Sequence, residues 1–323
     1  MTRRGLAAAL AAAAALAAAA PAAGEDLGEL RSALSGLQHD DTRLLSIGWR
    51  LARANAGFCA DPQPAVGLLP LDARSFARPA EIRAALGLGG EFAVQAVAAG
   101  SPAAEAALRP GEELVAIDGV ALDALPDVAP GSFSRLAALQ TRIEQTLGGA
   151  GALELELKAA GGAVRRVSLK GLAACRSRFE LLTGGNEASA DGQRVTISRR
   201  FLSLAHSDDE AAFFIGHELA HNILRHRAWL DKVGRSNANV RASERAADRL
   251  ALWLMANAGY DLARAPEFMQ RWGKRQANLL FHSSTHDHWK ARLILIEAEL
   301  PKIAAAREAH PGAALDWRPF FPR

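Results

Sequence analysis

Residues 216–222 read Gly-His-Glu-Leu-Ala-His-Asn, and the pattern His217-Glu218-x-x-His221 inside this stretch decides how the second half of the chain folds. Residues four apart on an α-helix lie on one face, one turn apart, so the two imidazoles can bind the same ion. Zinc suits imidazole nitrogen, and it keeps a position open for water when the protein supplies only three ligands. Glu218 stands beside the first histidine, where its carboxylate can take the proton of that water molecule.

The residues around this pattern indicate a well-defined helix. Ser207 and Glu210 have the spacing of a capping box, and apolar side chains follow at helical spacing, which predicts a buried helix from residue 208 to about residue 226. The bare pattern arises by chance in about one chain of this length in a hundred. Two histidines facing a core without a metal would lack partners, however, so the helical context favours a metal site.

A third ligand must come from further along the chain. In one subclass it is a histidine six residues after the second, but Arg227 stands there and excludes that subclass. His226 points off the metal face of the predicted helix, which favours a solvated histidine at the helix end. The apolar spacing of residues 247–258 predicts a second helix, and Gly259 closes it.

Two carboxylates, Glu244 and Asp248, lie one turn apart on the apolar side of this second helix, where they need partners. We predict that Glu244 is the third zinc ligand and that Asp248 accepts a hydrogen bond from a ligand imidazole. An ordinary surface glutamate with a neighbour four residues away is the alternative for Glu244.

Three stretches together make the chain resemble the zinc metallopeptidases related to HtpX and the CAAX prenyl protease. They are residues 207–222, the Glu244-x-x-x-Asp248 helix, and a later segment that contains Thr285, His286 and Arg292. The resemblance spans about residues 175–300. It implies that Glu244 is the third zinc ligand and that Arg292 lies close behind the ligands.

The resemblance also implies a role for His286. In the family, the histidine of this segment lies near the metal, where it could stabilise the oxyanion of the reaction or bind zinc as a displaceable fourth ligand. The family has a proline where this chain has Asp287, so the backbone there can differ. A solvated loop histidine is the alternative for His286.

The family further carries an edge strand before the metal-binding helix, on which an extended substrate can pair. Asn186 and Gly192 of that region are retained here, and residues 193–198 alternate as a strand does. Substrate pairing along residues 193–198 and a purely structural strand both agree with this pattern.

The amino terminus has the features of an export signal. Arg3 and Arg4 precede an alanine-rich apolar run over residues 5–20, and Ala20-Pro21-Ala22 offers the small residues that signal peptidase reads. The run is shorter than the roughly 20 apolar residues of a membrane span, and no later segment is long and apolar enough. We therefore expect a signal peptide over residues 1–22 and a periplasmic mature protein without a membrane span. This disfavours an intramembrane prenyl-protein protease.

Composition restricts the partners and the compartment. The 323 residues are 50% hydrophobic and 23% charged, which suffices for two domains with their own cores. The 38 basic and 35 acidic residues nearly balance, so nucleic acid and anionic membranes are not expected partners.

Cys59 and Cys175 would form one disulfide in an oxidising compartment, and two unpaired buried thiols are the alternative.

Two further regions precede the metal-binding part. Residues 25–57 carry leucines at helical spacing with an interruption near residues 39–41, which predicts a helical segment or a hairpin. Residues 80–172 combine short strands with glycine-rich turns and resemble a PDZ domain of the bacterial protease type, although Ala107 stands where glycine is common. That resemblance implies that a peptide carboxylate binds at the turn before residue 91 and that the peptide pairs with the strand at residues 91–97. A packing module that only gates the protease is the alternative.

The predicted organisation has four parts. A signal peptide (1–22) is followed by a helical segment with a connector (23–79), a PDZ-like domain (80–172) and a zinc metallopeptidase domain (173–323). The fold class is α+β, with a mainly helical, zincin-type peptidase domain and a small β-sheet after the β-rich PDZ-like domain. The expected function is hydrolysis of peptide bonds in misfolded or envelope proteins, with Glu218 as general base on a zinc-bound water. A peptide-binding or chaperone-like protein with a closed zinc site is the alternative.

Overall fold

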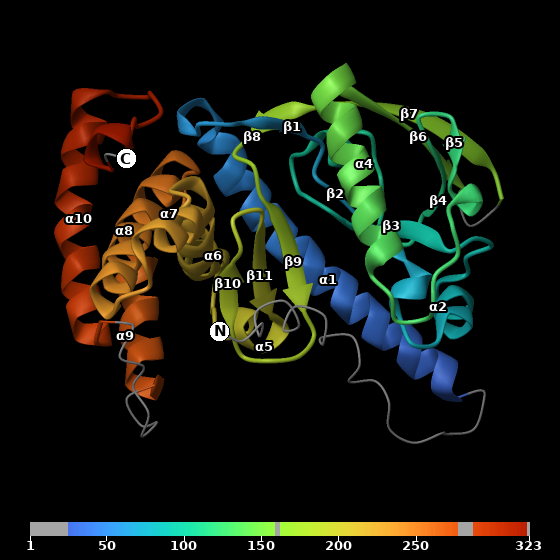
Figure 1. Ribbon diagram of the computed structural model, residues 1–323, viewed down its shortest axis with the longest axis horizontal. Coiled ribbons are helices and arrows are strands. Elements are labelled where there is room, and N and C mark those ends of the chain that lie inside the picture. The colour runs from blue at the N-terminus through green and yellow to red at the C-terminus, as the bar shows by residue number, and fades with distance from the viewer. Residues whose placement is uncertain (1–24, 159–161, 277–286, 322–323) are drawn as a thin grey trace. The chain divides into compact units, whose positions relative to one another are not determined.

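The computed structural model describes residues 25–158, 162–276 and 287–321 (Figure 1). Its elements form two compact units. The first contains the described residues up to 46, together with residues 64–172 and 181–185. The second contains residues 47–63, 173–180 and the described residues from 186 onward. The mixture of helices and β-sheets agrees with the predicted α+β class.

The first helix, α1 (Glu25–Ala54), runs through the predicted interruption near residue 40 without a break. Asp41 is buried, and its carboxylate accepts a hydrogen bond of 2.7 Å from Nε2 of Gln95. Because this polar side chain has a partner inside the unit, it does not end the helix, and the hairpin alternative is wrong. In the second unit Gly48 lets the ring of Phe179 pack directly against the backbone of α1, since a Cβ added at Gly48 would lie 2.4 Å from that ring.

The first unit is built on one antiparallel sheet with the strand order β2-β3-β4-β6-β7, and β5 pairs with β4. Helix α4 packs on β2 and β6 through a face that buries Leu139, Ile143 and Leu147. The elements of this unit are β2 (Leu68–Asp72), α2 (Pro79–Leu86), β3 (Phe92–Val97), α3 (Pro102–Glu105), β4 (Glu113–Ile117), β5 (Val120–Ala121), α4 (Ser134–Ala150), β6 (Ala152–Lys158) and β7 (Val164–Lys170). Strands β1 (Gln63–Ala65) and β8 (Leu172–Ala174) form a separate two-stranded sheet.

The predicted peptide-binding edge on residues 91–97 is wrong. Strand β3 lies between β2 and β4, and residues 68–72 pair along its length, from Leu68 opposite Val97 to Asp72 opposite Phe92. The connector that we expected before residue 80 therefore contains one of the two edge strands of the sheet, β2. Ala107 has φ of 57°, in the left-handed region that favours glycine, which gives a physical reason for the glycine common at this position.

The second unit combines a three-stranded sheet, in the order β10-β11-β9, with a group of helices. Helices α6 and α8 pack closely on each other, and α9 and α10 pack on them. The elements are β9 (Arg178–Leu182), β10 (Ala188–Ala190), β11 (Arg194–Ser198), α5 (Arg199–Leu202), α6 (Asp208–Ile223), α7 (His226–Val233), α8 (Asn237–Asn257), α9 (Arg264–Gln276) and α10 (Trp289–Ala309).

The two predicted helices of this unit begin and end for the expected local reasons. Ser207 caps α6, and its side chain accepts a hydrogen bond from the backbone N–H of Glu210. Gly259, with φ of 70°, follows the end of α8, and the N–H of Tyr260 bonds back to the carbonyl of Met255. Both helices therefore start or stop where the sequence indicated.

Strand β11 lies in the middle of its sheet, so of the two alternatives for residues 193–198 substrate pairing is excluded. Its two edges are taken by β10 and β9, which leaves the structural alternative for these residues. Strand β10 lies at one edge of this sheet and pairs antiparallel with β11. Ala188 lies opposite Ile197, and Ala190 lies opposite Val195.

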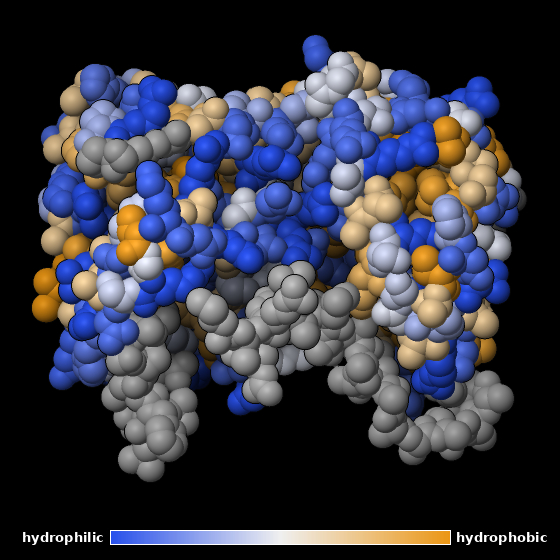
Figure 2. Space-filling model, viewed as in Figure 1, coloured by the Kyte–Doolittle hydropathy of each residue, from blue (hydrophilic) through white to orange (hydrophobic). Residues whose placement is uncertain are grey.

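The predicted disulfide is present. Cys59 and Cys175 are bonded, with their Cα atoms 5.6 Å apart. In the described part of the chain, no helix is long and apolar enough to cross a bilayer. Hydrophilic residues predominate on the face shown in Figure 2, and hydrophobic residues there lie in separate areas.

Candidate metal centre

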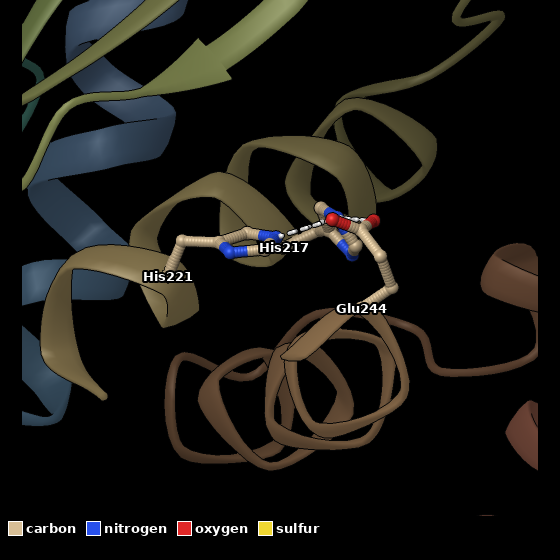
Figure 3. Close-up of side chains that lie close together, drawn as sticks. All are labelled: His217, His221 and Glu244. Carbon is tan, nitrogen blue, oxygen red and sulfur yellow. Dashed lines mark hydrogen bonds and ion pairs between the residues drawn. The ribbon is translucent and has the colours of Figure 1, made fainter. Parts of the chain in front are cut away.

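Helices α6 and α8 bring three potential metal ligands together (Figure 3). Nε2 of His217 lies 3.1 Å from Nε2 of His221 and 3.3 Å from a carboxylate oxygen of Glu244. The other carboxylate oxygen of Glu244 lies 3.5 Å from Nε2 of His221. Two imidazoles one turn apart on α6 therefore face one carboxylate from α8.

Two of these distances fall in the range expected around a tetrahedral metal ion, and the distance between the two histidines is about 0.2 Å shorter. Nitrogen and oxygen ligands about 2.0–2.2 Å from a tetrahedral ion lie about 3.3–3.6 Å from one another. The three ligand atoms all lie within 4.8 Å of each other, and the set of two histidines and one glutamate leaves a fourth position for water or substrate. The arrangement could hold a metal ion without rearrangement of the two helices.

Behind the ligands, Asp248 and Arg292 hold His217. Nδ1 of His217 lies 2.9 Å from Asp248, and Arg292 donates two hydrogen bonds to the same carboxylate, of 2.6 and 2.8 Å. Asp248 has no exposed surface. Burial would raise the pKa of Asp248, but the positive charge and hydrogen bonds of Arg292 overcome this and lower its pKa to about 2.

The electrostatic environment suits a cation. Burial by itself lowers the pKa of His217, but the carboxylates of Asp248 and Glu244 outweigh burial and raise this pKa to about 10. Carboxylates that stabilise a proton at Nε2 of His217 stabilise a metal ion at the same place. Burial and the neighbouring His217 lower the pKa of His221 to about 3, so His221 is a neutral imidazole with a lone pair to offer.

The prediction of a solvated His226 is wrong. Only 7% of this residue is exposed, and its Nδ1 lies 3.0 Å from Nδ1 of His221. The helical phase used for the prediction is lost because α6 ends at Ile223 and Arg225 adopts a left-handed conformation with φ of 55°. No spacing in the sequence signals that the chain turns there.

A cavity of about 480 Å³ opens onto the ligands. Glu218 lies on its wall beside the two histidines, and so do Ala188 and Ala190 of β10. The wall also has an apolar part, formed by Phe201, Phe213, Phe214, Leu230, Phe268, Met269 and Trp272. The candidate base, the candidate ligands and a strand edge therefore share one cavity.

Asn222, which the sequence reasoning did not single out, connects α6 to the β10–β11 turn. Its side-chain oxygen accepts a hydrogen bond of 2.7 Å from the N–H of Gly192, and its amide donates to the carbonyl of Arg194 and to Oγ of Ser177. One feature of the sequence indicated Asn222: it is a polar residue directly after His221 on a helix that is predicted to be buried. Asn222 ties the wall strand to the helix that carries the ligands.

The predicted site residue His286 lies outside the described residues. The neighbouring Asp287, which stands at the family's proline position, pairs with Arg245 through hydrogen bonds of 2.5 and 3.1 Å. Arg245 directly follows Glu244 on α8, so the beginning of the last described segment is attached next to a candidate ligand.

Comparison with known proteins agrees with part of this site. A family model described as Peptidase family M48 matches residues 187–235, which include β10, α6 and α7. The match contains His217, Glu218 and His221 and ends before Glu244. Neither the curated proteins nor the solved structures give a match. The match to residues 187–235 supports peptidase family M48 for this chain, and with it a metallopeptidase activity.

Proposed function

We propose that this protein is an exported zinc metalloendopeptidase. The observation that carries the proposal is that the ligand atoms of His217, His221 and Glu244 converge within 4.8 Å while Glu218 lies on the wall of the same cavity. A set of two histidines and one glutamate is typical of catalytic zinc sites, which keep one position open. The family match over residues 187–235 supports the same chemistry.

The residues around the ligands would have different roles in the reaction. Bound zinc would polarise the scissile carbonyl and bring the pKa of the attacking water toward roughly 7. Glu218 would act as the general base, taking a proton from the attacking water and passing it to the leaving amine nitrogen. Asp248 holds Nδ1 of His217 so that Nε2 faces the ligand cluster, and Arg292 keeps the buried Asp248 carboxylate charged.

The substrate would be held on strand β10. Because Glu187 and Asp191 hydrogen bond to β11, the alternation of an antiparallel strand turns the backbone N–H and C=O groups of Ala188 and Ala190 away from β11. Both alanines lie on the cavity wall. An extended peptide can therefore pair with β10 and pass over the ligands.

The apolar wall favours substrates with a large apolar side chain near the scissile bond. Phe213 and Phe214 lie one helical turn before His217 and Glu218, and the Phe214 ring packs 5.2 Å from that of Phe268. Each Å² of apolar surface that leaves water contributes about 25 cal/mol to binding. Misfolded segments expose such side chains, which makes misfolded or envelope proteins the proposed substrates.

The first unit would capture substrate, as the PDZ-like resemblance suggests. Strand β2 lies at one edge of its sheet, and Gly67 before it has φ of 68°, where an added Cβ would lie 2.3 Å from Cβ of Ser101. Such a turn needs glycine and can expose N–H groups to a peptide carboxylate. We propose that a peptide C-terminus adds to β2, beside α4, which packs on this strand.

Export to the periplasm is proposed on two grounds. Structural disulfides such as Cys59–Cys175 are typical of oxidising compartments and rare in the cytosol of mesophiles. The first 22 residues, which lie outside the described part, carry the pattern of a signal peptide.

The test compares the mature protein with Glu218→Gln on casein and on an unfolded protein, together with zinc analysis. Because general-base assistance contributes about 10²- to 10⁴-fold, the variant should bind zinc as the parent does and lose nearly all cleavage. Equal cleavage by both proteins would contradict the role of Glu218 as general base. A parent protein that binds zinc and peptides but cleaves neither substrate would instead support the peptide-binding, chaperone-like function.

A further inference from the structure

The second ligand histidine has a partner of its own, and this partner is another histidine. Nδ1 of His221 lies 3.0 Å from Nδ1 of His226, and the two rings meet edge to face with their centroids 4.8 Å apart. We infer that His226 is a positioning residue, which accepts a hydrogen bond from Nδ1 of His221 and so holds the Nε2 lone pair of His221 toward the metal. The inference rests on the metal centre proposed above.

If His221 binds the metal, the ring protons of His221 and His226 can be placed in only one way. Nε2 of His221 faces His217 and Glu244, so this nitrogen is the one that binds a metal and it must be unprotonated. A neutral imidazole then carries its proton at Nδ1 and donates it. The atom that lies 3.0 Å away is Nδ1 of His226, which must therefore be the acceptor and carry its own proton at Nε2.

The two ligand histidines are consequently held in different ways. His217 donates to the carboxylate of Asp248, which Arg292 fixes in turn. His221 donates to a neutral imidazole. Partners of this kind orient the ring and select its tautomer, and their loss typically weakens metal binding about 10- to 100-fold.

The chain places His226 by a local route. Helix α6 ends at Ile223, the N–H of Arg225 bonds to the carbonyl of Asn222, and Arg225 takes a left-handed conformation that residues other than glycine rarely adopt. This turn starts α7 at His226 and brings its imidazole back under α6, where it is buried. The left-handed conformation of Arg225 therefore places the buried imidazole of His226 beside Nδ1 of His221.

The experiment measures zinc affinity by competition with a chromogenic chelator, which needs no peptidase activity. His226→Phe keeps the ring volume without an acceptor and should bind zinc about 10- to 100-fold more weakly than the parent. His226→Asn restores an acceptor near the position of Nδ1 and should stay within about threefold of the parent. The exposed histidine control, His310→Phe, should leave the affinity unchanged.

A second measurement reports the tautomers directly. In the zinc-loaded parent protein, nitrogen-15 correlation spectra of the imidazole rings should show the proton of His221 on Nδ1 and that of His226 on Nε2. This spectrum decides the question even if His226→Phe fails to fold.

Three results would overturn the inference. They are parent-like zinc affinity in a folded His226→Phe protein, equal weakening in folded His226→Phe and His226→Asn proteins, and a proton on Nδ1 of His226 in the zinc-loaded parent. A parent protein that binds zinc with these tautomers but cleaves no peptide contradicts only the proposed peptidase activity. A parent protein that binds no zinc contradicts both.

Discussion

Asp248, which has no exposed surface, lies 2.9 Å from Nδ1 of His217 and accepts its hydrogen bond. The same carboxylate receives two hydrogen bonds from Arg292, so a buried charge is fully partnered one step behind the candidate metal ligands. The metal centre therefore depends on side chains that would not touch the metal, and its properties should respond to changes in them.

Asp248→Asn should lower zinc affinity about 10- to 100-fold, because an amide is a weaker acceptor for the His217 N–H and leaves Arg292 without its counter-charge. Competition with a metal chelator measures the change. Asp123→Asn, at an exposed aspartate of the first unit, is the control and should match the parent protein. Unaltered affinity in Asp248→Asn would show that this hydrogen bond does not orient the ligand.

Single removal of His217, His221 or Glu244 by alanine should abolish stoichiometric zinc binding, because two remaining protein ligands rarely hold this ion. Elemental analysis of the dialysed proteins gives the stoichiometry. Glu218→Gln should retain the metal in the same assay. Full zinc in Glu244→Ala would mean that another residue supplies the third ligand.

Ala190→Pro should weaken substrate binding, since proline removes an N–H that points away from β11 at the edge of the sheet. One hydrogen bond contributes about 0.5–1.5 kcal/mol, so kcat/KM should fall by several-fold at constant zinc content. Ala190→Val keeps the N–H and serves as the matched control. If the two variants lose activity equally, backbone pairing at β10 does not bind the substrate.

The intact mature protein should contain no titratable thiol and should be destabilised by reduction. Cys59 and Cys175 are separated by 116 positions, and closing a loop of this size contributes up to about 4–5 kcal/mol in the chain-entropy model. Thiol titration in denaturant and urea unfolding with and without reductant measure both effects. Two free thiols in protein from an oxidising compartment would contradict the bridge.

Acid should destabilise the protein partly through Glu299. This residue is fully buried, and burial would raise its pKa, but hydrogen bonds from Arg249, Lys302 and Trp253 overcome burial and lower its pKa below the usual 4.5. A lowered pKa in the folded state means that the stabilisation is present in full above about pH 4.5 and is lost as the pH falls through the folded-state pKa.

The free energy of unfolding of Glu299→Gln, measured from pH 7 to pH 3, tests this linkage. The variant should be less stable than the parent at pH 7, and the difference should shrink toward pH 3 as the parent carboxylate takes up its proton. Glu308→Gln changes an exposed glutamate of the same helix and should show neither effect. A stability difference that does not vary with pH would assign the loss to packing alone.

The sequence predicted well wherever the physical cause is local. The start of α6 at Ser207 and the end of α8 at Gly259 follow from side-chain and backbone capping within a few residues. The strand at 194–198 was indicated by alternation and the strand at 92–97 by its position between glycine-rich turns. Their neighbours in the sheets were not indicated, because pairing joins residues far apart in the chain. For this reason the peptide-pairing edge expected at residues 91–97 was wrong, and of the two alternatives for residues 193–198 the structural strand is the one found.

What the sequence by itself determined is the pair of histidines on one helix, since the helical period alone places His217 and His221 one turn apart with Glu218 beside them. Only the tertiary structure decided that Glu244 faces them from α8, because the packing of two helices sets that distance. It also decided that His226 is buried against His221, because the left-handed turn at Arg225 breaks the helical phase on which sequence reasoning depends.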